Sequence, residues 1–447
     1  MMRLSPSMIP ISLGLIETGV GRRLIFHPDI AGASTPPGWW FAFRWHAIKW
    51  CIATLALLAS GCHANTEGRL HPTEESLRIP GLQSEWIEKR TLSSSGSRTV
   101  GNDEAAFARI ASGFSNAIRT GAVGSSEADS LSFGSIADVA LDWHRGRILV
   151  LDGRSNQVVV LDTTMRIVDR FSRSGSGPGE LRMPRALGVT QAGTVVVADR
   201  GRMIKLFSDA GEGYVEKSKI VTSFNPEDIC IGDSSAYARG WEATQNAVIH
   251  EYLLTDGGLL RSIGSGYRDP SPFVQEQMSD GYVACASDGA WIAGAYQYLP
   301  VVVIHDGGGK PVKLLRIRDF HPRKIVETTN ESGRPRIVYR SDGSYSVISG
   351  LFTVSEELFG VQVAQVNSGG PDSRPHFDTY LVSARTGTAI YLEAIADGQQ
   401  IAGVMGPFLA TFSNDPFPQA ALWRMSIAND NNSISNGIEP KVSPVKK

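Results

Sequence analysis

The amino-acid sequence predicts an all-β protein built from repeated strands. Gly accounts for 47 of 447 residues, a share well above the usual value of roughly 7%, which favours short strands joined by tight turns. Apolar runs that end in Asp152 and Asp199 are 47 residues apart, and a second strand follows each of them after a turn. A single twisted sheet leaves both of its faces uncovered, so such units must stack in a ring. The prediction is therefore a six-bladed β-propeller of four-stranded antiparallel blades, closed by an N-terminal strand.

Composition and charge exclude several other classes of protein. The chain is 42% hydrophobic and 20% charged, with a net charge of −2, unlike a disordered tail, a collagen-like rod or a disulfide-dense mini-domain. A nucleic-acid binder needs an excess of Lys and Arg to neutralise phosphates. We therefore expect no nucleic-acid partner.

The N-terminal residues 1–61 have the features of a secretory signal. Nine apolar residues begin at Cys51, Arg44 and Lys49 precede them, and small residues follow. A bilayer span needs roughly 20 apolar residues, so this run is too short to cross a membrane. The stretch before residue 44 is either part of an unusually long signal or an extension from a start assigned too far upstream, and the second explanation is favoured.

The stretch Leu58-Ala-Ser-Gly-Cys62 resembles the lipobox of bacterial lipoproteins. The resemblance implies cleavage before Cys62 and acylation of its thiol and new amino group, which would hold the protein on the membrane. A plain signal peptide with an incidental Cys62 is the alternative. His63 stands where an Asp retains some lipoproteins at the inner membrane. The resemblance thus implies a lipid-anchored protein on the periplasmic side of the cell envelope, with the outer membrane preferred.

Three segments follow the signal in the predicted domain organisation. Residues 62–84 are polar and contain Pro, which predicts a lipidated tether. Residues 85–427 form the propeller, in which a short helix is expected over residues 104–120 and residues 86–92 are the candidate for the closing strand. Residues 428–447 are polar and predict a disordered tail. Removing the five basic and two acidic residues of the first 61 leaves a mature net charge of −5.

Six units of about 50 residues are recognised between residues 131 and 427. The first two contain residues 148–162 and 195–207, and weaker copies contain residues 236–253, 290–304, 358–382 and 408–425. Between the first two lie Gly175-x-Gly177-x-Gly179 and Pro184. Together with the strands 195–199 and 204–207, this junction resembles the NHL repeat of six-bladed propellers over about residues 131–211.

The NHL resemblance implies that these glycines carry the chain from the outer strand of one blade to the inner strand of the next. A phosphate cradle is the alternative interpretation of the three glycines, but it needs a helix to follow them. Pro184 and another strand follow instead, which favours the linker.

The innermost strands of a propeller line its central channel, so residues near the strand ends are the expected ligand contacts. By alignment of the repeats, these residues are Asp138, Arg185, Glu227 and Asp228, each just before an apolar stretch. Arg154, Arg200 and Arg202 follow the repeated Asp152 and Asp199 in the turn to the next strand. The two repeated Asp residues are expected to accept hydrogen bonds from turn backbone N–H groups.

No motif in the sequence identifies a ligand, a cofactor or a reaction. The body has five His residues (His144, His250, His305, His321 and His376), and no two of them have metal-ligand spacing. A G-x-S-x-G nucleophile elbow is also missing. We predict that the propeller binds a small molecule or an envelope protein. The alternative is a periplasmic hydrolase or lyase with a metal in the channel, which the NHL resemblance implies by fold analogy alone. A scaffold in an envelope complex is a third hypothesis.

Cys230 and Cys285 remain once Cys51 leaves with the signal and Cys62 takes the lipid. Both fall in predicted innermost strands of adjacent blades, within about one residue of the same register. An oxidising periplasm permits a disulfide between them. A one-residue shift would point one side chain away, so two buried free thiols are favoured over the bond.

Overall fold

The computed structural model describes residues 69–70, 82–87, 89, 102–124, 132–340, 343–367, 374–392 and 398–426. The predicted signal, the lipobox with Cys62, most of the tether and the tail 428–447 lie outside these residues. Within the described part of the chain, none of the helices has the length and apolar character needed to cross a membrane.

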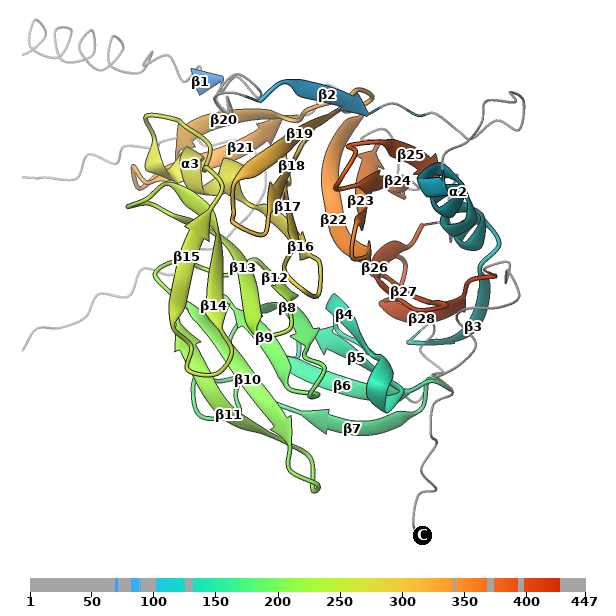
Figure 1. Ribbon diagram of the computed structural model, residues 1–447. Helices are drawn as coiled ribbons and strands as arrows, with labels where there is room; N and C mark the ends of the chain where they lie inside the picture. Colours follow the sequence, from blue (N-terminus) through green and yellow to red (C-terminus); the bar gives the residue numbers. More distant parts are fainter. Residues whose placement is uncertain are drawn as a thin grey trace, which may run out of the picture. The chain divides into compact units, whose positions relative to one another are not determined.

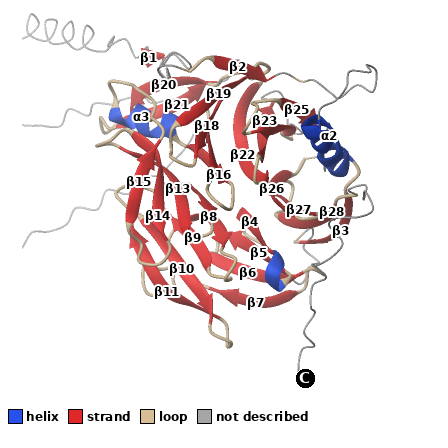
Figure 2. Cartoon of the chain, in the orientation of Figure 1, coloured by secondary structure: helices blue, strands red, loops and turns tan. Residues whose placement is uncertain are grey.

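The described residues form six four-stranded antiparallel blades arranged as a propeller, which confirms the predicted fold (Figures 1 and 2). Blade 1 contains β4 (Ile136–Asp142), β5 (Arg147–Asp152), β6 (Gln157–Asp162) and β7 (Ile167–Phe171). Blade 2 contains β8 (Pro184–Val189), β9 (Val195–Asp199), β10 (Met203–Asp209) and β11 (Tyr214–Val221). Blade 3 contains β12 (Asp228–Ile231), β13 (Ser235–Glu242), β14 (Ala247–Leu253) and β15 (Leu259–Ile263).

The second half of the ring has the same plan. Blade 4 contains β16 (Gly281–Cys285), β17 (Trp291–Tyr296), β18 (Val301–Asp306) and β19 (Pro311–Ile317). Blade 5 contains β22 (Tyr345–Ser355), β23 (Leu358–Val366), β24 (His376–Ser383) and β25 (Ala389–Leu392). Blade 6 contains β26 (Gln400–Met405), β27 (Phe408–Ser413), β28 (Gln419–Arg424) and β3 (Ile118–Val123). The innermost strands β4, β8, β12, β16, β22 and β26 pack against one another in that order and back to β4.

The apolar core lies between the blades, because each blade is covered on both faces. In β5, Leu149 and Leu151 pack against Leu187 of blade 2, whereas Val150 packs against Ala410 of blade 6. Successive side chains of a strand point to opposite faces. A strand between two neighbouring blades therefore requires an uninterrupted apolar run. In β5, Leu149, Val150 and Leu151 are all fully buried.

An N-terminal strand closes the ring, as predicted, but it is not the segment that we expected. β3 pairs antiparallel with β28 and so completes blade 6. The candidate, residues 86–92, was the wrong choice: β2 (Ser84–Ile87) lies parallel to β19 as a fifth strand of blade 4. Trp86 is 52% exposed, which suits a strand at the outer edge of a sheet. Asn414 in blade 6 also ties the ring together, since its side chain accepts from Ile136 N (2.8 Å) and donates to Ile136 O (2.9 Å).

The expected helix at residues 104–120 is present but shorter. α2 (Asn102–Ser115) buries Phe107, Ala111 and Phe114 in a cluster with residues of blades 5 and 6. The residues that follow form β3 instead of continuing the helix. Gly121 in β3 leaves room for Met165, whose Cγ would lie 2.7 Å from a Cβ at that position.

The glycine-rich segment between β7 and β8 carries the chain from the outer strand of blade 1 to the inner strand of blade 2. Gly177 N donates to the Glu180 carboxylate at 2.8 Å. The buried Lys205 ammonium contacts the carbonyl oxygens of Gly177 (3.2 Å) and Glu180 (2.5 Å) and the carboxylate of Glu216 (3.3 Å). These bonds hold the segment as an ordered linker, and a strand follows it, not a helix.

Two insertions in the ring had no counterpart in the sequence prediction. α3 (Pro272–Ser279) lies between blades 3 and 4. The hairpin of β20 (Lys324–Thr329) and β21 (Pro335–Arg340) lies between blades 4 and 5, and β1 (Arg69–Leu70) pairs with β20. Both insertions interrupt the 50-residue period, which is why the repeats are weaker in this half of the chain.

Candidate functional site

A cavity of about 960 Å³ lies in the centre of the ring and is lined by the innermost strands of all six blades. The four residues predicted as ligand contacts (Asp138, Arg185, Glu227 and Asp228) all line this cavity. The structure thus places them together, as the repeat alignment predicted. Whether they bind a ligand remains a prediction.

One end of the cavity is rich in arginine. Asp152 at the end of β5 pairs with Ile136, and Asp199 at the end of β9 pairs with Pro184. Residues that follow these Asp residues therefore lie where β4 and β8 begin. We call this end the arginine mouth, and its cavity-lining residues are Arg154, Arg182, Arg185 and Arg200.

Asp152 and Asp199 have the structural role that we predicted. The Asp152 carboxylate accepts from the backbone N–H groups of Gly134 (2.9 Å) and Arg154 (3.0 Å). The Asp199 carboxylate accepts from those of Arg182 (3.0 Å) and Met183 (2.9 Å). Both carboxylates hold the loops that carry the arginines.

Glu227 organises part of the arginine mouth. Its carboxylate accepts from Arg200 Nε (2.8 Å) and Nη2 (2.7 Å), and more weakly from Arg185 Nε (3.3 Å). Burial by itself would lower the pKa of Arg200, but the hydrogen bond and charge of Glu227 raise that pKa above its ordinary value. The Glu227 side chain is 12% exposed and that of Arg185 is 47% exposed. Arg200 is therefore fixed, whereas Arg185 keeps much of its guanidinium open to the cavity.

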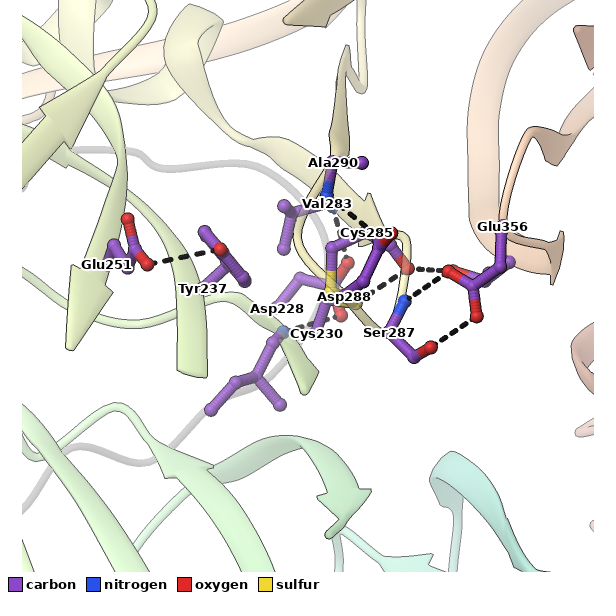
Figure 3. Close-up of a disulfide and its surroundings, with 12 residues drawn as sticks. Asp228, Cys230, Tyr237, Glu251, Val283, Cys285, Ser287, Asp288, Ala290 and Glu356 are labelled. Atoms are coloured by element: carbon purple, nitrogen blue, oxygen red, sulfur yellow. Dashed lines mark hydrogen bonds between the residues drawn. A yellow bond between two sulfur atoms is a disulfide. The ribbon is translucent and has the colours of Figure 1, made fainter. Parts of the chain in front are cut away.

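Asp138 and Asp228 join neighbouring blades inside the channel. The Asp138 carboxylate accepts from Val139 N at 2.7 Å and from Leu187 N in the next blade at 2.8 Å. The Asp228 carboxylate does the same with Ile229 N (2.9 Å) and Val283 N (2.8 Å; Figure 3). Both carboxyls line the cavity and are partly enclosed by protein atoms.

This enclosure changes the titration of both groups. Burial, and then the charge of Asp228, raise the pKa of Asp138 to about 8. Burial raises the pKa of Asp228 to about 7, against the lowering effect of its two backbone hydrogen bonds. At neutral pH the two carboxyls therefore carry less than their full negative charge.

A second cavity of about 230 Å³ adjoins the arginine mouth and shares Met183, Arg200 and Glu227 with the central cavity. It reaches Trp241, and Asp280 just after α3. Burial and the charge of Glu227 raise the pKa of Asp280 to about 6. The sequence analysis missed this extension because α3 belongs to no repeat.

Two further lining residues were also missed. Arg182 precedes Pro184 by two residues, so its place before an inner strand was a usable signal. Tyr282 in β16 lines the channel too, and burial raises the pKa of its hydroxyl. An aromatic residue in an apolar strand gave no indication that it faced the channel. Arg202, by contrast, is not among the residues that line either cavity.

Cys230 and Cys285 form a disulfide that joins the inner strands of blades 3 and 4 (Figure 3). Their Cα atoms are 5.9 Å apart. Our preference for free thiols is corrected here, because the register argument was wrong. In blade 3, Ile229 packs toward blade 2, so the next residue, Cys230, points to the other face, toward blade 4. In blade 4, Val283 packs toward blade 3, and Cys285, two residues later, lies on the same face. An offset of one residue is therefore what makes the two cysteines meet.

His250 in blade 3 is held by protein groups on both ring nitrogens. His250 Nε2 lies 3.0 Å from Gly240 O, its Nδ1 lies 2.9 Å from Ser262 Oγ, and its ring stacks on Phe224. Burial lowers the pKa of His250, and that of His305, to about 4. Across the described ranges, no three His, Cys, Asp or Glu side chains gather in a way that could hold a metal ion.

Comparison with known proteins adds distant structural likenesses. No protein-family model matches the chain, and no curated protein matches it. The chain is similar to a candidate exported protein from Bacteroides fragilis (TM-score 0.47, 10% identity, 76% of this chain and 100% of that one). It is also similar to a member of the DUF4221 family from Bacteroides vulgatus (TM-score 0.47, 11% identity, 70% and 98%). A third similar structure is the hydrazine synthase of Kuenenia stuttgartiensis (TM-score 0.39, 13% identity, 64% and 77%). Likenesses this distant assign neither a family nor a function.

Proposed function

We propose that this protein is a lipid-anchored binding protein of the bacterial cell envelope, which takes its ligand at the arginine mouth of the propeller. The observation that carries the proposal is the central cavity of about 960 Å³, whose polar and charged residues come from rigid strands and short turns. Small-molecule sites are concave, largely pre-formed and about this size. The lipid on Cys62 would give the protein its membrane partner, on the periplasmic side and preferably at the outer membrane.

Retention of small molecules tests the position of the site. The purified full chain is mixed with a low-molecular-weight extract of the cell envelope, and the retained compounds are identified by mass spectrometry. We expect the double variant Arg185→Ala/Glu227→Ala to lose compounds that the wild type retains, because it removes two of the cavity-lining side chains. If both proteins retain the same compounds, the ligand binds elsewhere.

Metabolic labelling tests the anchor. Cells fed radiolabelled palmitate should label the wild-type chain and leave Cys62→Ser unlabelled and unprocessed. Equal labelling of the two chains would show that Cys62 is not the acylated residue. Fractionation of the two membranes then tests the preference for the outer one.

The alternative of a hydrolase or lyase with a channel metal has no supporting cluster among the described residues. Elemental analysis of the purified protein tests it directly. Zinc or calcium retained at one equivalent through dialysis would favour the enzyme over the binding protein.

A further inference from the structure

We infer that the ligand is an anion whose carboxylate or phosphate groups are held by Arg154, Arg182 and Arg185. This inference rests on the proposed function, because it names the chemical class that the arginine mouth would bind. Arg has a planar, permanently charged fork of N–H donors that matches carboxylate and phosphate oxygens.

The first argument is the imbalance of charge around the arginine mouth. Four guanidinium groups line this end of the cavity, and Glu227 is the acid that pairs with two of them. Its carboxylate is committed mainly to Arg200. Arg154 and Arg182 are exposed and form no ion pair with any residue that the structure describes.

The second argument is convergence. Surface arginines are usually solvated individually and point in unrelated directions. Here Arg154 lies in the turn after β5, Arg182 in the loop before β8 and Arg185 within β8, yet all three line one cavity. Glu227 acts as a positioning residue, since it holds Arg200 and Arg185 beside each other.

The third argument is that the channel acids do not neutralise the arginines. Each oxygen of Asp138 and Asp228 already accepts a backbone hydrogen bond. Their raised pKa values reduce their negative charge at neutral pH. Asp152, Asp199 and Asp280 also lie near this end, but their carboxylates accept hydrogen bonds from backbone N–H groups. The guanidinium donors of Arg154 and Arg182 therefore stay available to an anion.

Calorimetric titration of the full-length protein tests the inference with four probes. Citrate and trigalacturonate carry carboxylates, pyrophosphate carries phosphates, and maltotriose is a neutral control of similar size. The mouth variant is Arg154→Gln/Arg182→Gln/Arg185→Gln. The matched control is Arg166→Gln/Arg170→Gln/Arg336→Gln, which removes the same charge from exposed positions that line neither cavity.

We expect at least one anionic probe to bind in a 1:1 ratio at low ionic strength, and maltotriose not to bind. A charge-assisted hydrogen bond is worth roughly tenfold in affinity, so the mouth variant should weaken binding at least roughly 100-fold and the control less than about twofold. The better of the carboxylate and phosphate probes identifies the acidic group.

Three results would overturn the inference: no anionic probe binds, maltotriose binds as well, or both variants weaken binding equally. The last would show attraction by overall charge alone. The inference and the proposed function fail separately. If the extract experiment yields a neutral compound that Arg185→Ala/Glu227→Ala loses, the site stands and the anionic ligand is wrong.

Discussion

The disulfide between Cys230 and Cys285 should contribute a large part of the stability of the propeller. The two cysteines are 55 residues apart, so the bond closes a long loop in the unfolded chain. In the chain-entropy treatment, a loop of this length loses roughly 14 cal/mol/K, or about 4 kcal/mol at 25 °C. We expect Cys230→Ala/Cys285→Ala to lower the free energy of unfolding by about this amount. Ala is the better replacement because Cys285 is 2% exposed, and a Ser hydroxyl there would need a partner.

Urea denaturation compares three samples: the oxidised wild type, the wild type unfolded and refolded with reductant, and the double variant. The last two should agree within about 1 kcal/mol and lie below the first. Their denaturant slope should also rise, because the unfolded chain without the bond exposes more surface. Alkylation in urea without reductant is the control, and it should leave both cysteines unlabelled. If it labels them, or if the variant loses less than about 1 kcal/mol, the bond or its entropic role is refuted.

Three single features give further expected outcomes. Lys205→Met deprives Glu216 and the linker carbonyls of their buried partner, so urea denaturation should show that the free energy of unfolding falls by about 3 kcal/mol. A fall below about 0.5 kcal/mol would mean that the linker stays in place without Lys205. Asp138 has a folded pKa of about 8, above its unfolded value, so its contribution to wild-type stability should fall as pH rises from about 4 to 8. Urea denaturation across that range should show a shallower decline for Asp138→Asn, and parallel curves would contradict the raised pKa. A chain beginning at residue 102 keeps α2 and β3 and should be monomeric with one cooperative unfolding transition, whereas a chain beginning at residue 125 lacks both and should aggregate. Equal behaviour on size exclusion would show that α2 and β3 are dispensable.

The strands that the sequence predicted best are the middle two of each blade. The run 195–199 and the run 204–207 became β9 and β10, and the weaker pairs became the corresponding strands of the other blades. These strands are covered on both faces, so their residues form uninterrupted apolar runs. Inner strands face the channel on one edge and carry polar residues, and outer strands such as β7 expose Ile167 and Val168. Their pattern is therefore weaker in the sequence.

The candidate site was predictable where it depended on the repeat and unpredictable elsewhere. Asp138 and Arg185 were located because the start of an inner strand can be aligned between units. Asp280 follows the inserted helix α3, for which the repeats offer no template. The closing strand was misassigned because the helix predicted over residues 104–120 included the first residues of β3 (Ile118–Val123), which left residues 86–92 as the candidate. Only pairing with β28 distinguishes them.

The strands that carry the arginine mouth are held by connections between the blades. The N-terminal segment covers the later blades: β2 extends blade 4, α2 packs on blades 5 and 6, and β3 completes blade 6. Side chains inside the channel join the blades as well: Asp138 connects blade 1 to blade 2, Asp228 connects blade 3 to blade 4, and Gln362 connects blade 5 to blade 6. The arginines stand on blades 1 and 2, which Asp138 connects. A binding site gains affinity when its groups need not be ordered on binding. Loss of either aspartate connection should therefore loosen the arginines.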